Sequence, residues 1–231
     1  MAAIQLEQEI DYPTSDGQPM AETTLHRKVM SDLIEGMETH YTAVPDVWVG
    51  GNLFLYYEKG NRSAAVAPDV LVARGVAKWD RDTYMLWEEG VPPCLVIEVT
   101  SRSTKDEDEG TKKRKYQRIG VEEVVLFDPY GEYLRPNRLK GYRLENGRYR
   151  PMRLERDGSL VSRTTGLTLR PEGLRLRLVE TVTGKPLPWR EEIEEALRAE
   201  AAARRAAEER LRVLEQELDR LRRAAEDTGK G

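Results

Sequence analysis

The stretch PCLVIEVTS, residues 93–101, places an acidic side chain, Glu98, in the middle of an apolar run. Such a run is typical of a strand that is buried on both faces of a sheet. A second run, AAVAPDVLVA at residues 64–73, carries Asp69 directly after Pro68. Burying a carboxylate is costly, so two of them on apolar strands indicate a shared task. The usual task is to hold a divalent metal against a phosphate.

The segment after residues 93–101 predicts a helix and then another buried strand. Residues 101–121 read SRSTKDEDEGTKKRKYQRIGV, which we interpret as a loop followed by a helix that ends at Gly120. Glycine is the residue expected just past a helix C-terminus. EEVVLFDP at residues 122–129 is the next apolar run. A strand, a helix and a strand in this order predict parallel pairing through a right-handed crossover.

Side chains alternate along a strand, so Glu98 and Thr100 point to one face and Val99 points to the other. If the strand that carries Asp69 is a neighbour, both carboxylates can face one point. There they would bind Mg²⁺ or Mn²⁺, with waters and a substrate phosphate completing an octahedron.

The predicted helix presents Asp108, Lys112, Tyr116 and Ile119 on one face. Lys112 on the strand-facing side would place an ammonium group near the carboxylates. It would there stabilise negative charge on a phosphorane or orient the attacking water. A structural alternative stays open for each residue: Glu98 forms a salt bridge with Lys112, Tyr116 belongs to the core, and Asp108 is a helix N-terminal acid favoured by the dipole.

The same helix carries a basic run, Lys113, Arg114 and Lys115. This run would grip phosphates along the path of an anionic substrate, or it forms a solvated face. The chain as a whole has 37 Lys and Arg against 41 Asp and Glu, a formal net charge of −4. No global field therefore favours nucleic acid, and a nuclease of this composition would bind through a local cluster.

Apolar residues recur at helical spacing over residues 21–41, which predicts an amphipathic helix with Thr23 or Thr24 as its cap. Short β-rich runs separated by Gly and Asn turns follow this helix. Farther along, an Asn-Gly pair at 146–147 and an Asp-Gly pair at 157–158 separate alternating segments. This pattern predicts a C-terminal β meander.

We expect three parts in the chain: a flexible segment at residues 1–19, one folded domain at 20–182, and a linker with a charged helix at 183–231. The last part follows a heptad seam that Glu200 and Arg204 interrupt. Such a seam predicts a paired coiled coil, and a single charged helix is the alternative. The apolar seam residues are Ile193, Leu197, Ala207, Leu211, Leu214, Leu218 and Leu221.

These motifs resemble the nuclease superfamily named for its PD-(D/E)xK signature, and more closely the Uma-type restriction endonuclease family within it. The resemblance covers roughly residues 20–180 of the sequence. The matching residues are Pro68-Asp69, EVTSRST at 98–104, Asp108, Lys112, Tyr116 and Gly120 at helical spacing, and VEEVVLFDP at 121–129.

The resemblance implies an α/β fold with a restriction-endonuclease-like core: a mixed sheet flanked by helices, followed by the β meander and the helical tail. It also implies Mg²⁺-dependent hydrolysis of phosphodiester bonds, with DNA as the substrate. In that reading Asp69, Glu98 and the Val99 carbonyl hold the metal, and Lys112 is the catalytic lysine.

One residue departs from the signature, because Thr100 stands where the family pattern has a lysine. In members of this kind the following helix supplies the lysine, which points to Lys112 first and to Lys115 as the reserve. Without either, the site would bind metal but hydrolyse slowly. An acidic residue or a histidine on the first helix often completes such sites, and Glu22 or His26 would serve here.

The remaining sequence limits the classes of protein that we expect. Cys94 is the single cysteine, so neither a disulfide framework nor a cysteine zinc site is expected. The sequence contains no glycine-rich phosphate-binding loop, so nothing in it indicates an organic cofactor. The first residues lack the pattern of a signal peptide, and no apolar run has the length of a membrane span. We therefore expect a cytoplasmic protein. We also expect a homodimer, to which the C-terminal helix could contribute.

Two alternatives to a nuclease remain at this point. The first is a catalytically inactive descendant of the same fold that binds nucleic acid or protein. The second is a scaffold in which the buried acids form ion pairs only.

Overall fold

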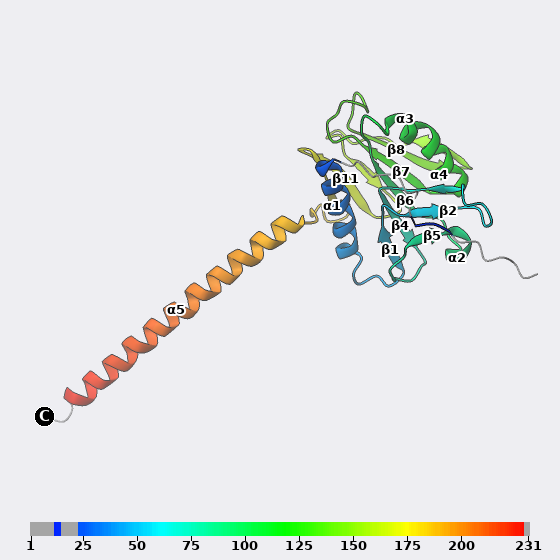
Figure 1. Cartoon of the computed structure of the whole chain (residues 1–231). Helices are drawn as coiled ribbons and strands as arrows, with labels where there is room; N and C mark the ends of the chain where they lie inside the picture. The colour runs from blue at the N-terminus through cyan, green and yellow to red at the C-terminus, as the bar shows by residue number, and fades with distance from the viewer. Residues whose placement is uncertain (1–11, 15–22, 229–231) are drawn as a thin grey trace, which may run out of the picture. The chain divides into compact units, whose positions relative to one another are not determined.

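The computed structural model describes residues 12–14 and 23–228. Contacts divide the chain into two compact units, Met1–Leu187 and Pro188–Gly231. The first unit extends beyond the predicted boundary at residue 182. Most of the predicted flexible segment at 1–19 lies outside the described residues. The predicted class is confirmed: the first unit is a mixed α/β fold with helices on both faces of its main sheet (Figure 1).

The main sheet has six strands in the order β1-β4-β6-β7-β8-β9. Strands β6 and β7 pair in parallel, as the strand–helix–strand pattern predicts. Strand β4 pairs with β6 in the antiparallel direction, so the runs that carry Asp69 and Glu98 are neighbours. The strands are β1 Val47–Gly50, β4 Val70–Arg74, β6 Leu95–Val99, β7 Glu123–Phe127, β8 Leu139–Glu145 and β9 Arg148–Pro151.

Two three-stranded sheets accompany the main sheet, in the orders β10-β11-β12 and β3-β2-β5. The predicted meander is present but divided, because β8 and β9 extend the main sheet while β10, β11 and β12 form a sheet of their own. The additional strands are β2 Phe54–Tyr56, β3 Ala65–Val66, β5 Thr83–Met85, β10 Leu160–Ser162, β11 Leu167–Glu172 and β12 Arg175–Glu180. Most strands that line the core are buried along their length.

The main sheet separates two hydrophobic clusters. On one face, Leu95 and Ile97 pack with α1 (Thr24–His40) and with the β10-β11-β12 sheet. On the other face, Val96 packs with Tyr116 of α4 (Lys113–Ile119) and with the β3-β2-β5 sheet. Glu98 and Thr100 share the strand parity of Val96, so they point toward the face that α4 covers.

The helix boundaries agree closely with the sequence pattern. Thr23 caps α1, because its side chain accepts a hydrogen bond from the backbone N–H of His26. Gly120 ends α4 with a left-handed φ of 93°. The predicted helix at 108–120 begins differently: one short α turn, α3 (Lys105–Glu107), leads into a π-helical turn, η1 (Asp108–Lys112), before α4 starts. The short helix α2 (Leu86–Glu89) follows β5.

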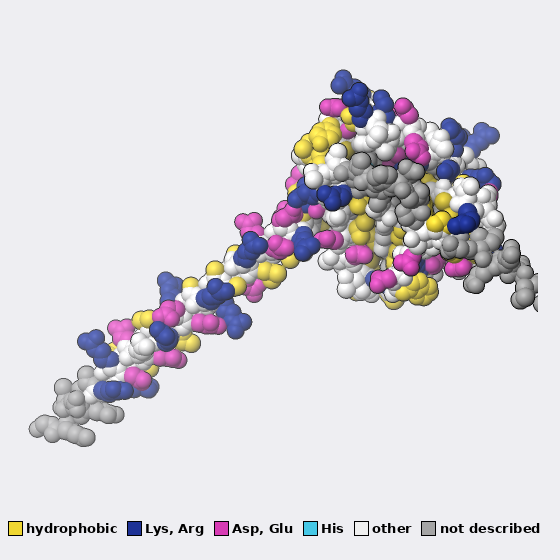
Figure 2. All heavy atoms as spheres, in the orientation of Figure 1, with side chains coloured by type: hydrophobic (Ala, Val, Ile, Leu, Met, Phe, Trp, Pro, Cys, Tyr) yellow, Lys and Arg dark blue, Asp and Glu magenta, His cyan; other side chains and the backbone are white. Residues whose placement is uncertain are grey.

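The second unit consists of the helix α5 (Arg190–Thr228). Its predicted seam residues carry exposed side chains, for example 58% at Leu211 and 62% at Leu221. Apolar side chains recur along α5 between acidic and basic ones (Figure 2). The paired coiled coil stays a prediction. Within the described residues, none of the helices combines the length and apolarity that a membrane crossing requires.

Candidate active site

Asp69 lies directly before β4, and the loop after β1 holds its backbone. The backbone N–H of Asn52 donates to the Pro68 carbonyl at 2.9 Å. Gly51 packs so closely on the Asp69 carbonyl that a Cβ at position 51 would overlap that oxygen. The contacts between the loop after β1 and Pro68-Asp69 therefore fix the backbone position of Asp69.

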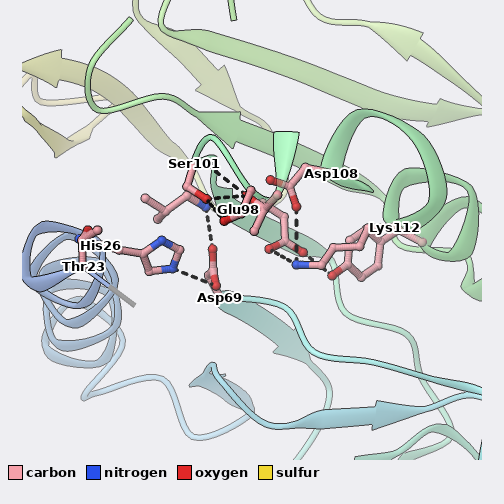
Figure 3. A network of polar contacts seen from close by, with 11 residues as sticks. Thr23, His26, Asp69, Glu98, Ser101, Asp108 and Lys112 are labelled. Atoms are coloured by element: carbon pink, nitrogen blue, oxygen red, sulfur yellow. Dashed lines mark hydrogen bonds and ion pairs between the residues drawn. The ribbon is translucent and has the colours of Figure 1, made fainter. Parts of the chain in front are cut away.

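Two contacts orient the Asp69 carboxylate (Figure 3). The backbone N–H of Val99 donates to Oδ2 at 2.7 Å, which links the start of β4 to the end of β6. His26 reaches from α1 and places Nε2 at 3.1 Å from Oδ1. The Asp69 side chain keeps an exposed fraction of 14%, so solvent can reach it.

Glu98 is almost completely buried, with an exposed fraction of 1%. Lys112 Nζ donates to Oε2 at 2.9 Å, and the Tyr116 hydroxyl donates to Oε1. Burial raises the pKa of Glu98 to about 8, with Lys112 opposing this rise and Asp69 adding to it. Loss of water around the charged form is the dominant cause.

Lys112 lies between two acids, because its Nζ is also 3.4 Å from Oδ1 of Asp108 (Figure 3). This distance is that of an ion pair. Burial alone would lower the pKa of Lys112, but Glu98, Asp108 and Asp69 outweigh it and hold that pKa above its ordinary value. Lys112 is therefore a cation throughout the physiological range. Burial raises the pKa of Asp108 as well.

A cavity of about 690 Å³ opens over these groups. Glu98 and Asp108, each 1% exposed, do not line the cavity, but both contact Lys112, which does. The predicted site residues that line it are His26, Asp69, Val99, Thr100 and Lys112.

The donor set fits a hard divalent cation that keeps several waters. Mg²⁺ is commonly held by one or two carboxylates and by substrate phosphate, not by a full protein cage. Among the described residues, no group of three or more His, Cys, Asp or Glu side chains is arranged to hold a metal. Among the residues that the structure describes, the buried Thr100 Oγ1 has no hydrogen-bond partner. Such atoms are normally satisfied in proteins, by water if not by another residue.

Comparison with known proteins places the chain in a family. Residues 2–176 match the model of the Uma2 family, described as "Putative restriction endonuclease". This match spans well over half of the chain. The chain belongs to the Uma2 family. No curated protein matches it.

A solved structure is also similar to this Uma2 protein. It is described as a "putative nuclease" belonging to DUF820 from Anabaena variabilis ATCC 29413. The two chains are 13% identical with a TM-score of 0.45, over 64% of this chain and 76% of the other.

The basic run of the helix does not reach the cavity. Lys115 Nζ donates to the Ala65 carbonyl at 3.0 Å, and Lys113 Nζ lies over the Tyr142 ring, 4.3 Å from its centroid. Arg114 bonds to the Thr111 hydroxyl at 3.2 Å. Lys113 and Arg114 leave the helix on other faces than Lys112. Lys115, three residues after Lys112, lies on the same side of the helix, but the Ala65 carbonyl holds its Nζ. Lys112, and not the reserve Lys115, is therefore the lysine beside the carboxylates of this Uma2 protein.

The other predicted helper residues separate into two groups. His26 contacts Asp69, and Tyr116 contacts Glu98, so both belong to the network. Glu22 lies outside the described residues.

Several residues of the cavity wall were missed by sequence reasoning. Asn52 comes from the loop that holds Pro68, and Ser101 and Thr104 come from the loop after β6. Tyr130 and Tyr133 come from the loop after β7. The sequence Asp-Pro-Tyr-Gly-Glu-Tyr at 128–133 held a signal, since an acidic residue at a strand end commonly organises a turn.

Proposed function

We propose that this Uma2 protein is a Mg²⁺- or Mn²⁺-dependent endonuclease that hydrolyses phosphodiester bonds in DNA. The observation that carries the proposal is the meeting of Asp69, Glu98 and Lys112 beside one cavity. Membership of a family described as restriction endonucleases supports the same reaction class. We further propose that it acts as a homodimer in the cytoplasm, with α5 contributing to pairing.

Asp69, Glu98 and the Val99 carbonyl would hold the metal, consistent with the loop contacts that fix Asp69. When bound, the metal supplies Lewis-acid activation of the phosphate and lowers the pKa of a coordinated water. His26 limits the rotation of the Asp69 carboxylate through its contact with Oδ1. The Tyr116 hydroxyl does the same for Glu98, because it occupies Oε1.

Lys112 would act as a fixed positive charge and not as a general base. Its pKa lies above the ordinary value because the carboxylates around it outweigh its burial. An ammonium group that stays protonated stabilises the negative charge that develops on the phosphorane. Its three N–H groups also allow it to orient an attacking water while it holds Glu98.

Metal binding is the first test. Isothermal titration of Mn²⁺ into wild type should give a saturable site, and Asp69→Asn and Glu98→Gln should each weaken it by at least tenfold. Both substitutions keep the side-chain shape but remove the charge. The control is Glu58→Gln, which changes a carboxylate that pairs with Arg118 elsewhere on the surface. Absence of Mn²⁺ binding by wild type would refute the proposal.

Catalysis is tested with Lys112 and a matched lysine on the same helix. Lys112→Ala should reduce cleavage of plasmid and single-stranded DNA by about 100-fold or more, in line with the loss of one preorganised charge at a reacting centre. Lys115→Ala should leave cleavage close to wild type, because Lys115 contacts the Ala65 carbonyl. Equal losses in the two variants would contradict the assigned role.

The contacts of Glu98 also favour a second candidate, a catalytically inactive nuclease fold that binds nucleic acid or protein. Lys112 and Tyr116 occupy both Glu98 oxygens without a metal. This network satisfies Glu98 entirely within the protein, as a scaffold would. Mn²⁺ binding without cleavage of any DNA substrate after prolonged incubation would select this candidate.

A further inference from the structure

The loop after β7 is held rigidly by a single buried carboxylate. Asp128 is fully buried, and its Oδ1 accepts hydrogen bonds from the N–H groups of Tyr130 and Gly131 at 3.0 and 2.9 Å. Its Oδ2 accepts from Tyr133 and Leu134 at 2.6 and 3.1 Å. Hydrogen bonds to an ionised acceptor are among the stronger ones in proteins. The backbone of 130–134 is therefore fixed.

Arg138 closes the loop from the other side. Its Nε donates to the Asp128 carbonyl at 3.1 Å, and its two terminal nitrogens donate to the carbonyls of Pro129 and Gly173. The guanidinium also lies over the Phe127 ring. This clamp ties the loop to the turn between β11 and β12.

The rigid loop presents two tyrosines to the candidate active site. Tyr130 and Tyr133 line the same cavity as Asp69 and Lys112. The Tyr130 side chain is 55% exposed, although most large apolar side chains of this unit are buried. Packing therefore gives no reason for a clamped loop that holds an aromatic ring in water.

We propose that Tyr130 and Tyr133 form a stacking surface for the base of an unpaired nucleotide next to the phosphate that Asp69 and Lys112 approach. This inference rests on the proposed nuclease function and deepens it. Aromatic side chains bind single strands because every base offers a face for stacking. A base within a duplex is already stacked on its neighbours, so a single-stranded or locally opened strand is the favoured substrate.

Fluorescence anisotropy with a labelled single-stranded oligonucleotide in Ca²⁺ buffer tests the surface without turnover. Loss of one stacked base is expected to weaken binding by about 5-fold or more. Tyr130→Ala and Tyr133→Ala should each show this loss, and Tyr130→Phe should retain wild-type binding. Trp79→Ala is the matched control, because Trp79 is similarly exposed at 58% but does not line this cavity.

Base stacking also predicts a dependence on the DNA itself. An oligonucleotide with an abasic position at the bound nucleotide should bind wild type as weakly as the normal strand binds the Tyr130→Ala variant. Equal binding by wild type and the Tyr130→Ala/Tyr133→Ala double variant would overturn the stacking surface, as would preference for intact duplex. If only the stacking surface is wrong, the protein still binds Mn²⁺ and cleaves DNA. If the nuclease proposal is wrong, Mn²⁺ binding or DNA cleavage is absent.

A different observation, the charge pattern of α5, carries a second inference. Ala207, Leu211, Leu214, Leu218 and Leu221 follow the alternating spacing of a coiled-coil seam. The four leucine side chains are 48–62% exposed in the single chain. Residues that flank such a seam decide which partner fits and in which orientation.

The flanking charges match one arrangement of two identical helices. In a parallel pair in register, the residue just before Leu211 or Leu218 faces a residue of the other helix. That residue lies five positions later in the sequence. Arg210 then meets Glu215 of the second copy, and Glu217 meets Arg222. The antiparallel alignment that opposes Leu211 and Leu214 brings Glu208 against Glu215 and Arg210 against Glu217, so repulsion there offsets attraction. Like charges at these positions oppose pairing.

We infer that α5 pairs with α5 of a second copy as a parallel, in-register coiled coil over residues 207–222. This inference gives the proposed homodimer its orientation and does not depend on the active site. Arg204 falls on the seam immediately before Ala207, so the regular pairing begins after it.

Cysteine cross-linking of the full chain distinguishes the orientations. Oxidised glutathione should link Leu221→Cys to itself, because position 221 lies beside its own copy only in the parallel pair. A mixture of Leu221→Cys with Arg204→Cys should give the mixed disulfide only if the helices are antiparallel. The native thiol does not interfere, since Cys94 is buried and burial raises its pKa to about 11.

Charge reversal provides an independent check by analytical ultracentrifugation. Arg210→Glu should weaken the dimer several-fold, and adding Glu215→Arg in the same chain should restore it, as expected for exposed ion pairs. A mixed 204–221 disulfide would overturn the parallel orientation while keeping the dimer. A monomeric wild type at all concentrations would overturn the dimer itself.

Discussion

Glu98 is a carboxylic acid in an almost water-free position, and this fixes how its charge responds to pH. Its pKa rises from an ordinary 4.5 to about 8 in the folded protein, because burial penalises the charged form. The folded state therefore holds a proton that the unfolded chain has already released. Burial shifts the pKa of Asp108 in the same direction.

We expect the metal-free protein to lose stability as the pH rises from about 4.5 to about 8. Within this window the unfolded state binds fewer protons than the folded state, so the free energy of unfolding falls with pH. Urea unfolding at several pH values would measure the slope. Glu98→Gln, which has no proton to lose, should flatten it, and an unchanged slope would mean that Glu98 is ionised when buried.

Thr100 marks the departure from the family signature and carries a hydroxyl without a hydrogen-bond partner. A buried unsatisfied polar group costs about 1–3 kcal/mol. We expect Thr100→Val to stabilise the metal-free protein by about 1 kcal/mol, measured by urea unfolding. The control is Thr165→Val, because the Thr165 hydroxyl donates to Ser162 Oγ at 2.7 Å and its loss should destabilise. Destabilisation by both changes would indicate that Thr100 has a water partner.

At the scale of elements, one buried carboxylate connects the main sheet to the β10-β11-β12 sheet. Glu123 of β7 pairs with Arg143 of β8 at 2.7 Å and accepts hydrogen bonds from the hydroxyls of Ser162 and Thr164 at 2.6 and 3.1 Å. Its exposed fraction is 0%. This network joins three strands that are distant in the sequence.

Glu123→Ala should destabilise the protein by about 3 kcal/mol, since it leaves a partly buried guanidinium and two hydroxyls without their acceptor. Thermal unfolding followed by circular dichroism would measure the loss. Glu58→Ala offers the comparison, because it removes an acid whose partner Arg118 is 70% exposed. An exposed pair of this kind contributes about 1 kcal/mol or less. Similar losses for the two variants would argue against the network.

The elements themselves were largely predictable, because their signals are local. Strand alternation and helical spacing are sufficient to place Glu98, Lys112 and Tyr116 on facing surfaces, and Gly120 marks the helix end. The π-helical turn at Asp108–Lys112 was not predictable, since DEGTK fits a regular helix equally well. Within this turn, Lys112 contacts Glu98 of β6, which lies earlier in the chain.

The arrangement of the meander and of the cavity wall could not be predicted from the sequence either. Turn signals at 146–147 and 157–158 predict hairpins but do not say which sheet each hairpin joins. The positions of Tyr130 and Tyr133 follow from the contacts of Asp128, which looks like an ordinary strand end in the sequence. Metal binding by Asp69 and Glu98 stays a prediction.

At the scale of the whole molecule, the first unit includes a segment that the predicted boundary at 182 excludes. Leu187 packs against the core, and its N–H donates to the Leu178 carbonyl at 2.8 Å. The Leu187 carbonyl accepts from Arg177 at 3.2 Å. The segment 183–187 therefore returns to β12 and covers its edge.

Two truncations measure the contribution of this segment. A chain that ends after Pro188 should unfold at the same temperature as the first unit of the full protein. A chain that ends after Val182 should lose about 2 kcal/mol or more, because it gives up the apolar contact of Leu187 and several hydrogen bonds, including the one from the Glu180 N–H to the Lys185 carbonyl. Equal melting temperatures for the two truncations would show that residues 183–187 add nothing to stability.

Gly51 shows how a residue without a side chain can limit sequence variation around a reaction centre. A Cβ at this position would collide with the Asp69 carbonyl, and backbone cannot move aside as a flexible side chain can. In a saturation library selected for DNA cleavage, position 51 should accept no replacement, while Gly110, where a Cβ would meet only the flexible end of Arg114 at 4.0 Å, should accept several. Intolerance at position 51 would then reflect geometry alone, in a residue that donates no atom to the chemistry.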